Sequence, residues 1–258
     1  MTYIHNINPV MFEIFSIKLY WYGFMYALSF IIIDYLIVSE SKNKKNVLNK
    51  NQAEKFTITI LLFAILGGRL GYVFFYDFDY FSMNIISMFS IWEGGMSFHG
   101  GLLGAALGIL YFAKTNDLEF FDVSDLISLY APIGLFFGRL GNFINAELYG
   151  MQTSGSWGVI FPSVDNNLRH PTMLYEAFLE GIILFIILLV VRQKKKIKAG
   201  LITGYFLIFY AIFRFGVEFI RLPDAHIGYI YYDWVTMGHL LTIPMFILGT
   251  ILIFRKSA

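Results

Sequence analysis

Polar and charged side chains stand directly after an apolar stretch, in a pattern that could hold an anion. The segment from Gly138 to Gly150 reads GRLGNFINAELYG, and it continues an apolar run that begins near Leu126. On a helix, Arg139 and Asn142 lie three residues apart and therefore share a face. A charge at the centre of a membrane-spanning helix costs at least ~2.5–3.5 kcal/mol, so an anion or a water-filled cavity should meet it. The alternative is an arginine that only extends to the lipid headgroups.

Three arginines fall inside apolar runs, namely Arg69, Arg139 and Arg214. A guanidinium binds a phosphate through two hydrogen bonds, and phospholipid headgroups supply phosphate esters in a membrane. We therefore favour an anionic ligand as the partner of Arg139 and Arg214, whereas a carboxylate is an equally good partner for Arg69. The carboxylates available in or near the apolar runs are those of Asp34, Asp125, Glu176 and Glu218.

A histidine and two tyrosines complete the candidate chemistry. His99 stands among glycines in the segment Glu93–Gly101, and an imidazole can accept a proton near neutral pH. Tyr210 lies four residues before Arg214 and shares its helical face, and Tyr22 falls in another apolar run. A phenol can donate a hydrogen bond to a phosphate oxygen. The alternatives are a structural role for His99 and aromatic packing for both tyrosines.

The composition is that of a membrane protein. Of the 258 residues 57% are hydrophobic and only 14% are charged, against about 25% charged in soluble domains. The net charge of +1 gives no basis for binding nucleic acid. Cysteine is absent, so a reacting thiol would have to come from a partner. The histidines lack a metal-binding spacing, and the N-terminus lacks the features of a cleaved signal peptide, so the first apolar run should remain as an anchor.

Seven apolar runs are long enough to cross a bilayer, and such segments must be helices because a helix satisfies its own backbone hydrogen bonds. The runs are Leu19–Val38, Phe56–Tyr76, Ser97–Ala113, Val123–Gly141, Thr172–Val191, Leu201–Ile220 and Trp234–Phe254. The prediction is an all-α membrane protein: a bundle of seven transmembrane helices with a small extracytoplasmic head, in one domain over residues 1–258. Thirteen of the 19 Lys and Arg residues fall on one side of these runs. That bias places the N-terminus outside and the C-terminus in the cytoplasm.

Glycines recur at four-residue spacing in the second, third and fourth runs, at Gly67/Gly71, Gly100/Gly104/Gly108 and Gly134/Gly138. Small residues at this spacing let helices approach closely, so we expect these three runs to pack together. The outer segments Asp77–Met96 and Met151–Pro171 are aromatic, and we expect short amphipathic pieces at the membrane surface there.

The segment Gly138–Gly150 resembles the signature of the bacterial prolipoprotein diacylglyceryl transferases. Further blocks similar to that family follow in the same order over nearly the whole chain: Trp21–Gly23, Gly67–Tyr72, Gly94–Gly101, Arg169–Pro171, Phe213–Arg214 and Arg221–Asp224. The outer segment Met151–Arg169 is shorter than in some relatives, so we expect the head to differ in detail.

The resemblance implies an enzyme of the bacterial plasma (inner) membrane with its active site toward the extracytoplasmic side. It would transfer the diacylglyceryl group of phosphatidylglycerol to the lipobox cysteine thiol of a preprolipoprotein signal peptide, forming a thioether and releasing glycerol 1-phosphate. By resemblance, Arg139 binds phosphatidylglycerol and Arg214 is a second essential arginine. The other positions implied in catalysis or substrate binding are Tyr22, His99, Asn142, Glu147, Gly150, Tyr210 and Arg221. We expect no cofactor and no metal, because the lipid ester already carries the leaving group.

Two other classes of protein fit parts of the pattern. A lipid or anion transporter could use the same arginines as a substrate path, but it would need polar residues that continue to the cytoplasmic ends of the runs. The polar residues gather outward instead. An intramembrane protease would need a Ser/His or metal arrangement, for which the sequence offers no credible candidate.

Overall fold

The computed structural model describes residues 2–15, 17–42, 47–75, 78–90, 95–193, 198–223 and 228–255. Within these ranges six helices are long and apolar enough to cross a membrane. They are α1 (Trp21–Ser41), α2 (Lys50–Phe75), α5 (Phe120–Ile144), the continuous helix Thr172–Arg192, α8 (Leu201–Glu218) and α9 (Met237–Phe254). The seventh predicted span, Ser97–Ala113, corresponds to α4 (Phe98–Thr115), whose described apolar part, Gly100–Thr115, is shorter. The helical prediction is confirmed for six spans.

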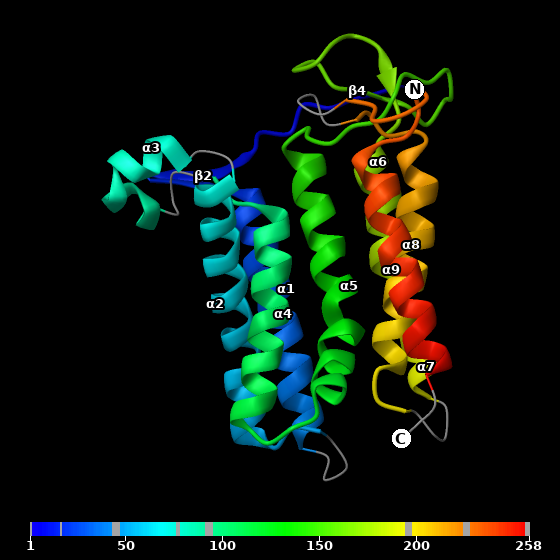
Figure 1. Cartoon of the computed structure of the whole chain (residues 1–258). Helices are drawn as coiled ribbons and strands as arrows, with labels where there is room; N and C mark the ends of the chain where they lie inside the picture. Colours follow the sequence, from blue (N-terminus) through cyan, green and yellow to red (C-terminus); the bar gives the residue numbers. More distant parts are fainter. Residues whose placement is uncertain are drawn as a thin grey trace. The chain divides into compact units, whose positions relative to one another are not determined.

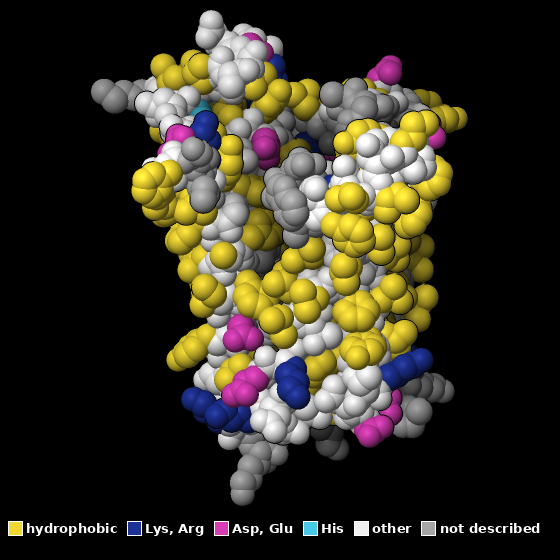
Figure 2. Space-filling model, turned by 90° about the vertical axis from the view of Figure 1, so that its left-hand side faces the viewer, with side chains coloured by type: hydrophobic (Ala, Val, Ile, Leu, Met, Phe, Trp, Pro, Cys, Tyr) yellow, Lys and Arg dark blue, Asp and Glu magenta, His cyan; other side chains and the backbone are white. Residues whose placement is uncertain are grey.

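Apolar side chains face outward from these helices. On α2 and α4 the exposed side chains include those of Leu62, Leu66, Leu102 and Leu103. Figure 2 shows apolar side chains covering much of the visible helical surface. In water such a surface would drive aggregation, while in a bilayer it meets lipid tails. The helices therefore belong to a multi-pass membrane protein.

Residues Asp34–Ser124 form one compact unit, in which α2 and α4 pack through glycines. A Cβ atom added to Gly67 would lie 2.4 Å from the carbonyl oxygen of Gly100, and one added to Gly104 would lie 2.2 Å from that of Phe63. Neither site can hold a side chain unless the helices separate. The predicted close approach of the second and third runs is confirmed.

Two short helices follow α2 in this unit. They are α3 (Phe78–Met83) and the 3-10 helix η1 (Ile85–Phe89). The sequence predicts short amphipathic pieces in Asp77–Met96, and two short helices lie in this segment. Their position at the membrane surface stays a prediction, and Trp92 and Gly94 lie outside the described residues.

Arg69 of α2 holds the chain that precedes α4. Its guanidinium donates hydrogen bonds to the backbone carbonyls of Ser87 (2.6 Å), Met88 (2.8 Å) and Gly95 (3.0 Å). Its charge also lies 5.0 Å from the centre of the Phe81 ring. Arg69 therefore ties the segment between α2 and α4 to α2 through the backbone of that segment.

Residues Met1–Ile33 and Asp125–Ala258 form the second compact unit. Its helix Thr172–Arg192 consists of α6 (Thr172–Glu176), a π-helical stretch η3 (Ala177–Ile183) and α7 (Leu184–Arg192). Helices α7, α8 and α9 of this unit lie side by side (Figure 1). Figure 1 also shows β4 at the end of the unit from which α6 begins.

The glycines of α5 pack against α1 in this unit. A Cβ atom added to Gly138 would lie 3.5 Å from the Tyr26 hydroxyl, and one added to Gly141 would lie 2.7 Å from the Tyr22 ring. Within this unit, Gly134 and Gly138 lie beside Ile33 and Tyr26 of α1. The expected packing of these two glycines with the second and third runs stays a prediction.

Short strands at the same end of the unit depart from the all-α prediction. Strand β1 (Tyr3–Ile4) pairs parallel with β4 (Val159–Ile160), which pairs antiparallel with β5 (Leu168–Arg169). A hairpin of β2 (Val10–Ile14) and β3 (Ile17–Tyr20) leads into α1. The side chains of Val159, Phe161 and Met173 form a small core beside this sheet. Strands of two residues leave no periodic signal, which explains why the sequence pattern did not predict them.

Helix α9 begins at Met237 rather than at Trp234 as predicted. Val235 pairs with Tyr231 in an antiparallel bridge and Thr236 has an extended backbone, so Trp234 lies in the turn before the helix. Thr236 then caps the helix, because its hydroxyl accepts a hydrogen bond from the N–H of His239.

Candidate active site

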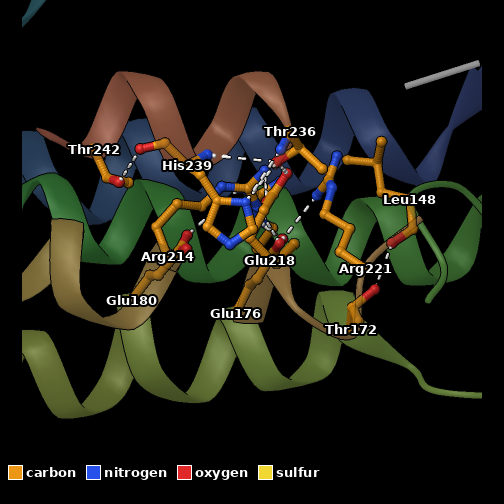
Figure 3. Close-up of polar contacts among 11 residues, drawn as sticks. Leu148, Thr172, Glu176, Glu180, Arg214, Glu218, Arg221, Thr236, His239 and Thr242 are labelled. Atoms are coloured by element: carbon orange, nitrogen blue, oxygen red, sulfur yellow. Dashed lines mark hydrogen bonds and ion pairs between the residues drawn. The ribbon is translucent and has the colours of Figure 1, made fainter. Parts of the chain in front are cut away.

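Three arginines of the second unit converge on one buried glutamate. Nε of Arg139 lies 2.8 Å from Oε2 of Glu176, and Nη1 of Arg221 lies 2.9 Å from Oε1. Arg214 forms a further ion pair with Oε1, and the contacts of Arg214 and Arg221 are drawn in Figure 3. The carboxylate of Glu176 therefore serves three cations.

Two more glutamates complete the cluster. Nη2 of Arg139 lies 3.4 Å from Oε2 of Glu180, and Nη2 of Arg214 lies 2.6 Å from Oε2 of Glu218. Three arginines and three glutamates balance in charge when every group is ionised. We refer to the six residues as the arginine–glutamate cluster: Arg139, Glu176, Glu180, Arg214, Glu218 and Arg221.

The helices of this unit position the cluster. Helix α5 supplies Arg139, and α8 supplies Arg214 and Glu218, which lie four residues apart on one face. Glu176 ends α6 and Glu180 lies in the π-helical stretch η3. A π-helical turn widens a helix and is frequent at functional sites. Both glutamates of this helix reach Arg139.

The glutamates are sealed from solvent, while the arginines retain a small exposed surface. The side chains of Glu176 and Glu180 are 0% exposed, whereas those of Arg139 and Arg214 are 17% and 13% exposed. Among the described residues, the ion pairs of each of these two arginines use two of its three guanidinium nitrogens. A guanidinium has five N–H donors, so each arginine keeps donors beyond its ion pairs. The exposed surface at the cluster therefore belongs to the arginine side chains rather than to Glu176 and Glu180.

The sequence favours an anionic ligand over a carboxylate as the partner of Arg139 and Arg214, and here the structure differs. Both arginines are paired with glutamates. A lone guanidinium in a low-dielectric interior is far more costly than a paired one, which is the physical reason. An anion that binds here shares the guanidinium groups with the glutamates and does not neutralise them alone.

A second polar group lies at the end of α5. Nδ2 of Asn142 donates a hydrogen bond to Oε2 of Glu147 at 3.1 Å, and Nδ2 of Asn145 donates to Oε1 at 3.2 Å. The phenol of Tyr22 in α1 lies close to the side chains of both Asn142 and Glu147. The structure thus brings together three predicted site residues, Tyr22, Asn142 and Glu147. Arg139, three residues before Asn142, belongs to the arginine–glutamate cluster and pairs with Glu176 and Glu180.

Gly150 and Arg221 lie side by side as an antiparallel bridge. The N–H of Met151 donates to the carbonyl of Ile220 at 2.8 Å. A Cβ atom on Gly150 would lie 2.5 Å from that carbonyl oxygen, so a larger residue would force the strands apart. This bridge fixes the chain that carries Arg221 beside Glu176.

Tyr210 lies one turn before Arg214 on α8 and next to the arginine–glutamate cluster. Its phenol interacts electrostatically with the charged side chains of Glu180, Arg139 and Arg214. The predicted proximity of Tyr210 to Arg214 is confirmed.

His99 lies in the first turn of α4, in the unit formed by Asp34–Ser124. Its side chain lies outside the described part of the structure, so its relation to the other candidate residues stays a prediction. The start of α4 is fixed to α2, because the N–H of Ser97 donates to the carbonyl of Gly68 at 2.8 Å. The hydroxyl of Ser97 also accepts the N–H of Gly100 at 3.2 Å as a helix cap.

The sequence did not single out Glu180, and it considered Glu176 and Glu218 only as partners for arginine. Glu176 and Glu180 stand four residues apart in the apolar run Thr172–Val191. Two carboxylates at that spacing in a membrane helix are rare unless they meet cations, and this signal could have identified Glu180. Within the described ranges no group of three or more His, Asp and Glu residues could hold a metal ion.

The fold and the site define a class: a multi-pass membrane protein with a buried cluster of arginines and glutamates. The family model described as prolipoprotein diacylglyceryl transferase matches residues 9–255. A relative from Nitratidesulfovibrio vulgaris is 42% identical over 244 residues, which cover 95% of this chain and 92% of the relative. One from Xanthomonas euvesicatoria is 38% identical over 276 residues, with coverage of 98% and 92%. Both are named phosphatidylglycerol–prolipoprotein diacylglyceryl transferase. The chain belongs to the prolipoprotein diacylglyceryl transferase family, and the resemblance seen in the sequence is confirmed.

Proposed function

We propose that this chain transfers the diacylglyceryl group of phosphatidylglycerol to the cysteine thiol in the lipobox of a preprolipoprotein signal peptide. The family and the names of the relatives, which specify phosphatidylglycerol and a prolipoprotein, support this reaction. The chain has no cysteine of its own, so the reacting thiol comes from the peptide. The reaction is the first step of lipoprotein maturation.

The sulfur attacks the glycerol carbon that carries the phosphate ester. A carbon–sulfur bond forms, the carbon–oxygen bond to the phosphate breaks, and glycerol 1-phosphate leaves with the electron pair of that bond. The thiol proton passes to a base. A thiol at pH 7 is only a few per cent thiolate, so the protein has to assist deprotonation and to hold the charge of the departing phosphate.

The arginine–glutamate cluster is the observation that carries this proposal. Arg139 and Arg214 keep exposed surface beside sealed glutamates, and their remaining N–H donors would hold the phosphate. Donors that are already oriented in a low-dielectric site stabilise developing charge more than donors in water do. Glu176 holds both guanidinium groups in one orientation, so little reorganisation is needed as the charge builds up. Gly150 and Arg221 hold the adjoining wall through their bridge.

The remaining family positions take supporting roles in this proposal. Tyr22, Asn142 and Glu147 lie together at the end of α5 and orient the substrates there. Tyr210 lies beside the cluster, and its hydroxyl donates a hydrogen bond to the phosphate in this proposal. His99 is assigned as the base from the family resemblance and the proton affinity of imidazole.

The proposed topology has seven crossings of the bacterial plasma (inner) membrane in one domain, residues 1–258. Six long helices support six crossings, and α4 is proposed as the seventh. The clustering of Lys and Arg residues in one set of connections supports an outer N-terminus and a cytoplasmic C-terminus. The end of the second unit that carries β1, β4 and β5 then becomes the extracytoplasmic head, next to the active site.

Product analysis tests the proposed function. The purified protein in phosphatidylglycerol vesicles should convert a lipobox peptide to a thioether-linked diacylglyceryl peptide and release one equivalent of glycerol 1-phosphate. A peptide with serine in place of the cysteine is the control, and it should stay unmodified. Lipid that is relocated across the vesicle while the peptide remains unmodified would indicate a transporter and would overturn the proposal.

A further inference from the structure

Glu218, one of the two glutamates that pair with Arg214, also accepts a hydrogen bond from the residue that caps α9. The hydroxyl of Thr236 donates to Oε1 of Glu218 at 2.6 Å, while Oε2 of Glu218 lies 2.6 Å from Nη2 of Arg214 (Figure 3). Thr236 is 3% exposed and Glu218 is 4% exposed. One buried carboxylate therefore joins the N-terminus of α9 to the arginine–glutamate cluster.

Gly238 provides the space for this carboxylate. A Cβ atom added to Gly238 would lie 2.5 Å from Oε1 and 2.7 Å from Oε2 of Glu218, which is closer than Cβ atoms come to other atoms in proteins. The carboxylate thus lies against the first turn of α9. The N–H groups at a helix start favour a negative charge, so α9 adds an electrostatic contact to the hydrogen bond.

His239 leaves the Thr236 hydroxyl available to Glu218. The N–H of Thr236 donates to Nδ1 of His239 at 3.2 Å, which assigns Nδ1 as the unprotonated ring nitrogen. The Thr236 hydroxyl has one proton, and its oxygen lies 2.6 Å from Glu218 but 3.1 Å from Nδ1. The shorter distance assigns the proton to the bond with Glu218. The capping geometry of α9 therefore also orients Glu218.

We propose that Thr236 is a positioning residue for Arg214. It orients Glu218, and Glu218 fixes the direction in which the guanidinium of Arg214 presents its remaining donors to the lipid phosphate. Gly238 belongs to the same arrangement, because a side chain there would push the carboxylate away from the cap. This inference rests on the proposed function, since it takes the phosphate as the ligand of Arg214.

The chain offers a matched control for the hydroxyl of Thr236. Thr242 lies in α9, is also 3% exposed, and donates its hydroxyl to the carbonyl of His239 at 2.7 Å. Thr236→Val and Thr242→Val each remove one buried hydroxyl. Thr236→Val removes the bond to Glu218 and the cap of α9, whereas Thr242→Val leaves both in place. Thr236→Ser keeps the hydroxyl and serves as the rescue variant.

We expect Thr236→Val to lower kcat for diacylglyceryl transfer about 10-fold or more, because a hydrogen bond to a charged group is lost. Thr242→Val should keep the parental kcat, and Thr236→Ser should recover most of it. Gly238→Ala, which displaces Glu218 but leaves the hydroxyl in place, should lower kcat as well. Rates are expressed per folded enzyme, with melting temperatures measured in parallel, so a loss of stability alone does not produce this pattern.

A double variant separates positioning from a general structural role. In a Glu218→Gln background, Thr236→Val should add little further loss of kcat, because the charged contact that it orients is already gone. Full additivity of the two losses, or equal kcat of Thr236→Val and Thr242→Val, would overturn the inference. A parent protein that forms no thioether product would instead overturn the proposed function, so the two failures are distinguishable.

Discussion

Nε of Arg139 and Oε2 of Glu176 face each other at 2.8 Å, across two helices of the same unit. The other oxygen of the same carboxylate pairs with Arg214 and Arg221. One glutamate therefore sets the spacing of three guanidinium groups. A phosphate that binds here would meet guanidinium N–H donors that Glu176 already orients, rather than an unpaired positive charge.

Replacement of Glu176 should be the most damaging single change in the cluster. Glu176→Gln leaves buried guanidinium groups without their shared carboxylate, and removal of one partner of a buried pair typically destabilises by about 3–5 kcal/mol. We expect a clear fall in melting temperature and loss of transfer activity, measured on the detergent-purified protein. Glu54→Gln is the control, because its 3.6 Å pair with Lys50 is exposed and such pairs contribute about 0–1 kcal/mol. Equal melting temperatures for both variants would contradict the shared role of Glu176.

The geometry of the two arginines should matter as well as their charge. Lysine keeps the charge but cannot hold two glutamates and a phosphate in fixed directions. Arg139→Lys and Arg214→Lys should therefore lower the rate of transfer by about 100-fold to 1,000-fold, as expected for loss of an oriented donor. Single-turnover transfer of labelled diacylglyceryl to a lipobox peptide measures this. A parental rate in Arg139→Ala or in Arg214→Ala, inserted normally in the membrane, would remove the replaced arginine from the mechanism.

His99 should reveal itself in the dependence of the rate on pH. If its imidazole takes the thiol proton, the parent loses activity as the imidazole becomes protonated toward about pH 6, and His99→Gln loses this limb together with most of its rate. The measurement is kcat from about pH 6 to about pH 9 for both proteins. Matching rates over the whole range would show that another group is the base.

Asp125 should contribute to stability without affecting catalysis. Its Oδ1 accepts the N–H of Thr203 at 2.8 Å and its Oδ2 accepts the N–H of Gly200 at 2.9 Å, so a side chain of α5 caps the start of α8. Asp125→Ala should destabilise the protein by about 0.5–2 kcal/mol, the range for loss of a helix cap. Asp125→Asn, which keeps one acceptor, should lie between it and the parent in melting temperature. A change in kcat per folded enzyme would contradict this assignment.

The ion pair between Asp165 and Arg169 predicts an effect at acid pH. Nη2 of Arg169 lies 2.5 Å from Oδ2 of Asp165, and the hydrogen bonds from Arg169 lower the pKa of Asp165 from 3.8 to about 2. Because the folded-state pKa is the lower one, the pair stabilises the protein above about pH 4, and this contribution is lost as pH falls toward about 2. The melting temperature of Asp165→Asn should fall less steeply than that of the parent over this window. Parallel curves would show that the pair does not contribute.

Much of the fold follows from the amino-acid pattern because lipid imposes simple rules. A long apolar run in lipid has to be a helix, because only a helix satisfies the backbone hydrogen bonds within the segment. The spacing of Gly67, Gly100 and Gly104 predicts the close contact of α2 and α4. The strands β1, β4 and β5 could not be predicted, since two-residue strands depend on contacts between distant segments. The same limit applied to the start of α9, where the chain reverses at Tyr232 and Asp233.

The sequence identifies the arginines of the site, but it does not identify the glutamates that pair with them. Arg139 and Arg214 stand out in apolar runs, and the segment that follows Arg139 carries Asn142 and Glu147. A single sequence does not show which carboxylate each arginine meets. Glu180 and Arg139 are 41 residues apart along the chain, so only the packing of α5 against the helix Thr172–Arg192 brings them together.

The central claim is that Arg139 and Arg214 contact the phosphate of phosphatidylglycerol. The most direct test is the distance from the lipid phosphorus to the guanidinium nitrogens, measured by solid-state NMR on nitrogen-labelled arginine in phosphatidylglycerol vesicles. Arg139→Lys and Arg214→Lys assign the signals. The account predicts, in the parent protein, phosphorus–nitrogen distances short enough for direct N–H···O hydrogen bonds, in which nitrogen and phosphate oxygen lie about 3 Å apart. A phosphate bound out of contact with both arginines, while these keep only Glu176, Glu180 and Glu218 as partners, would contradict it.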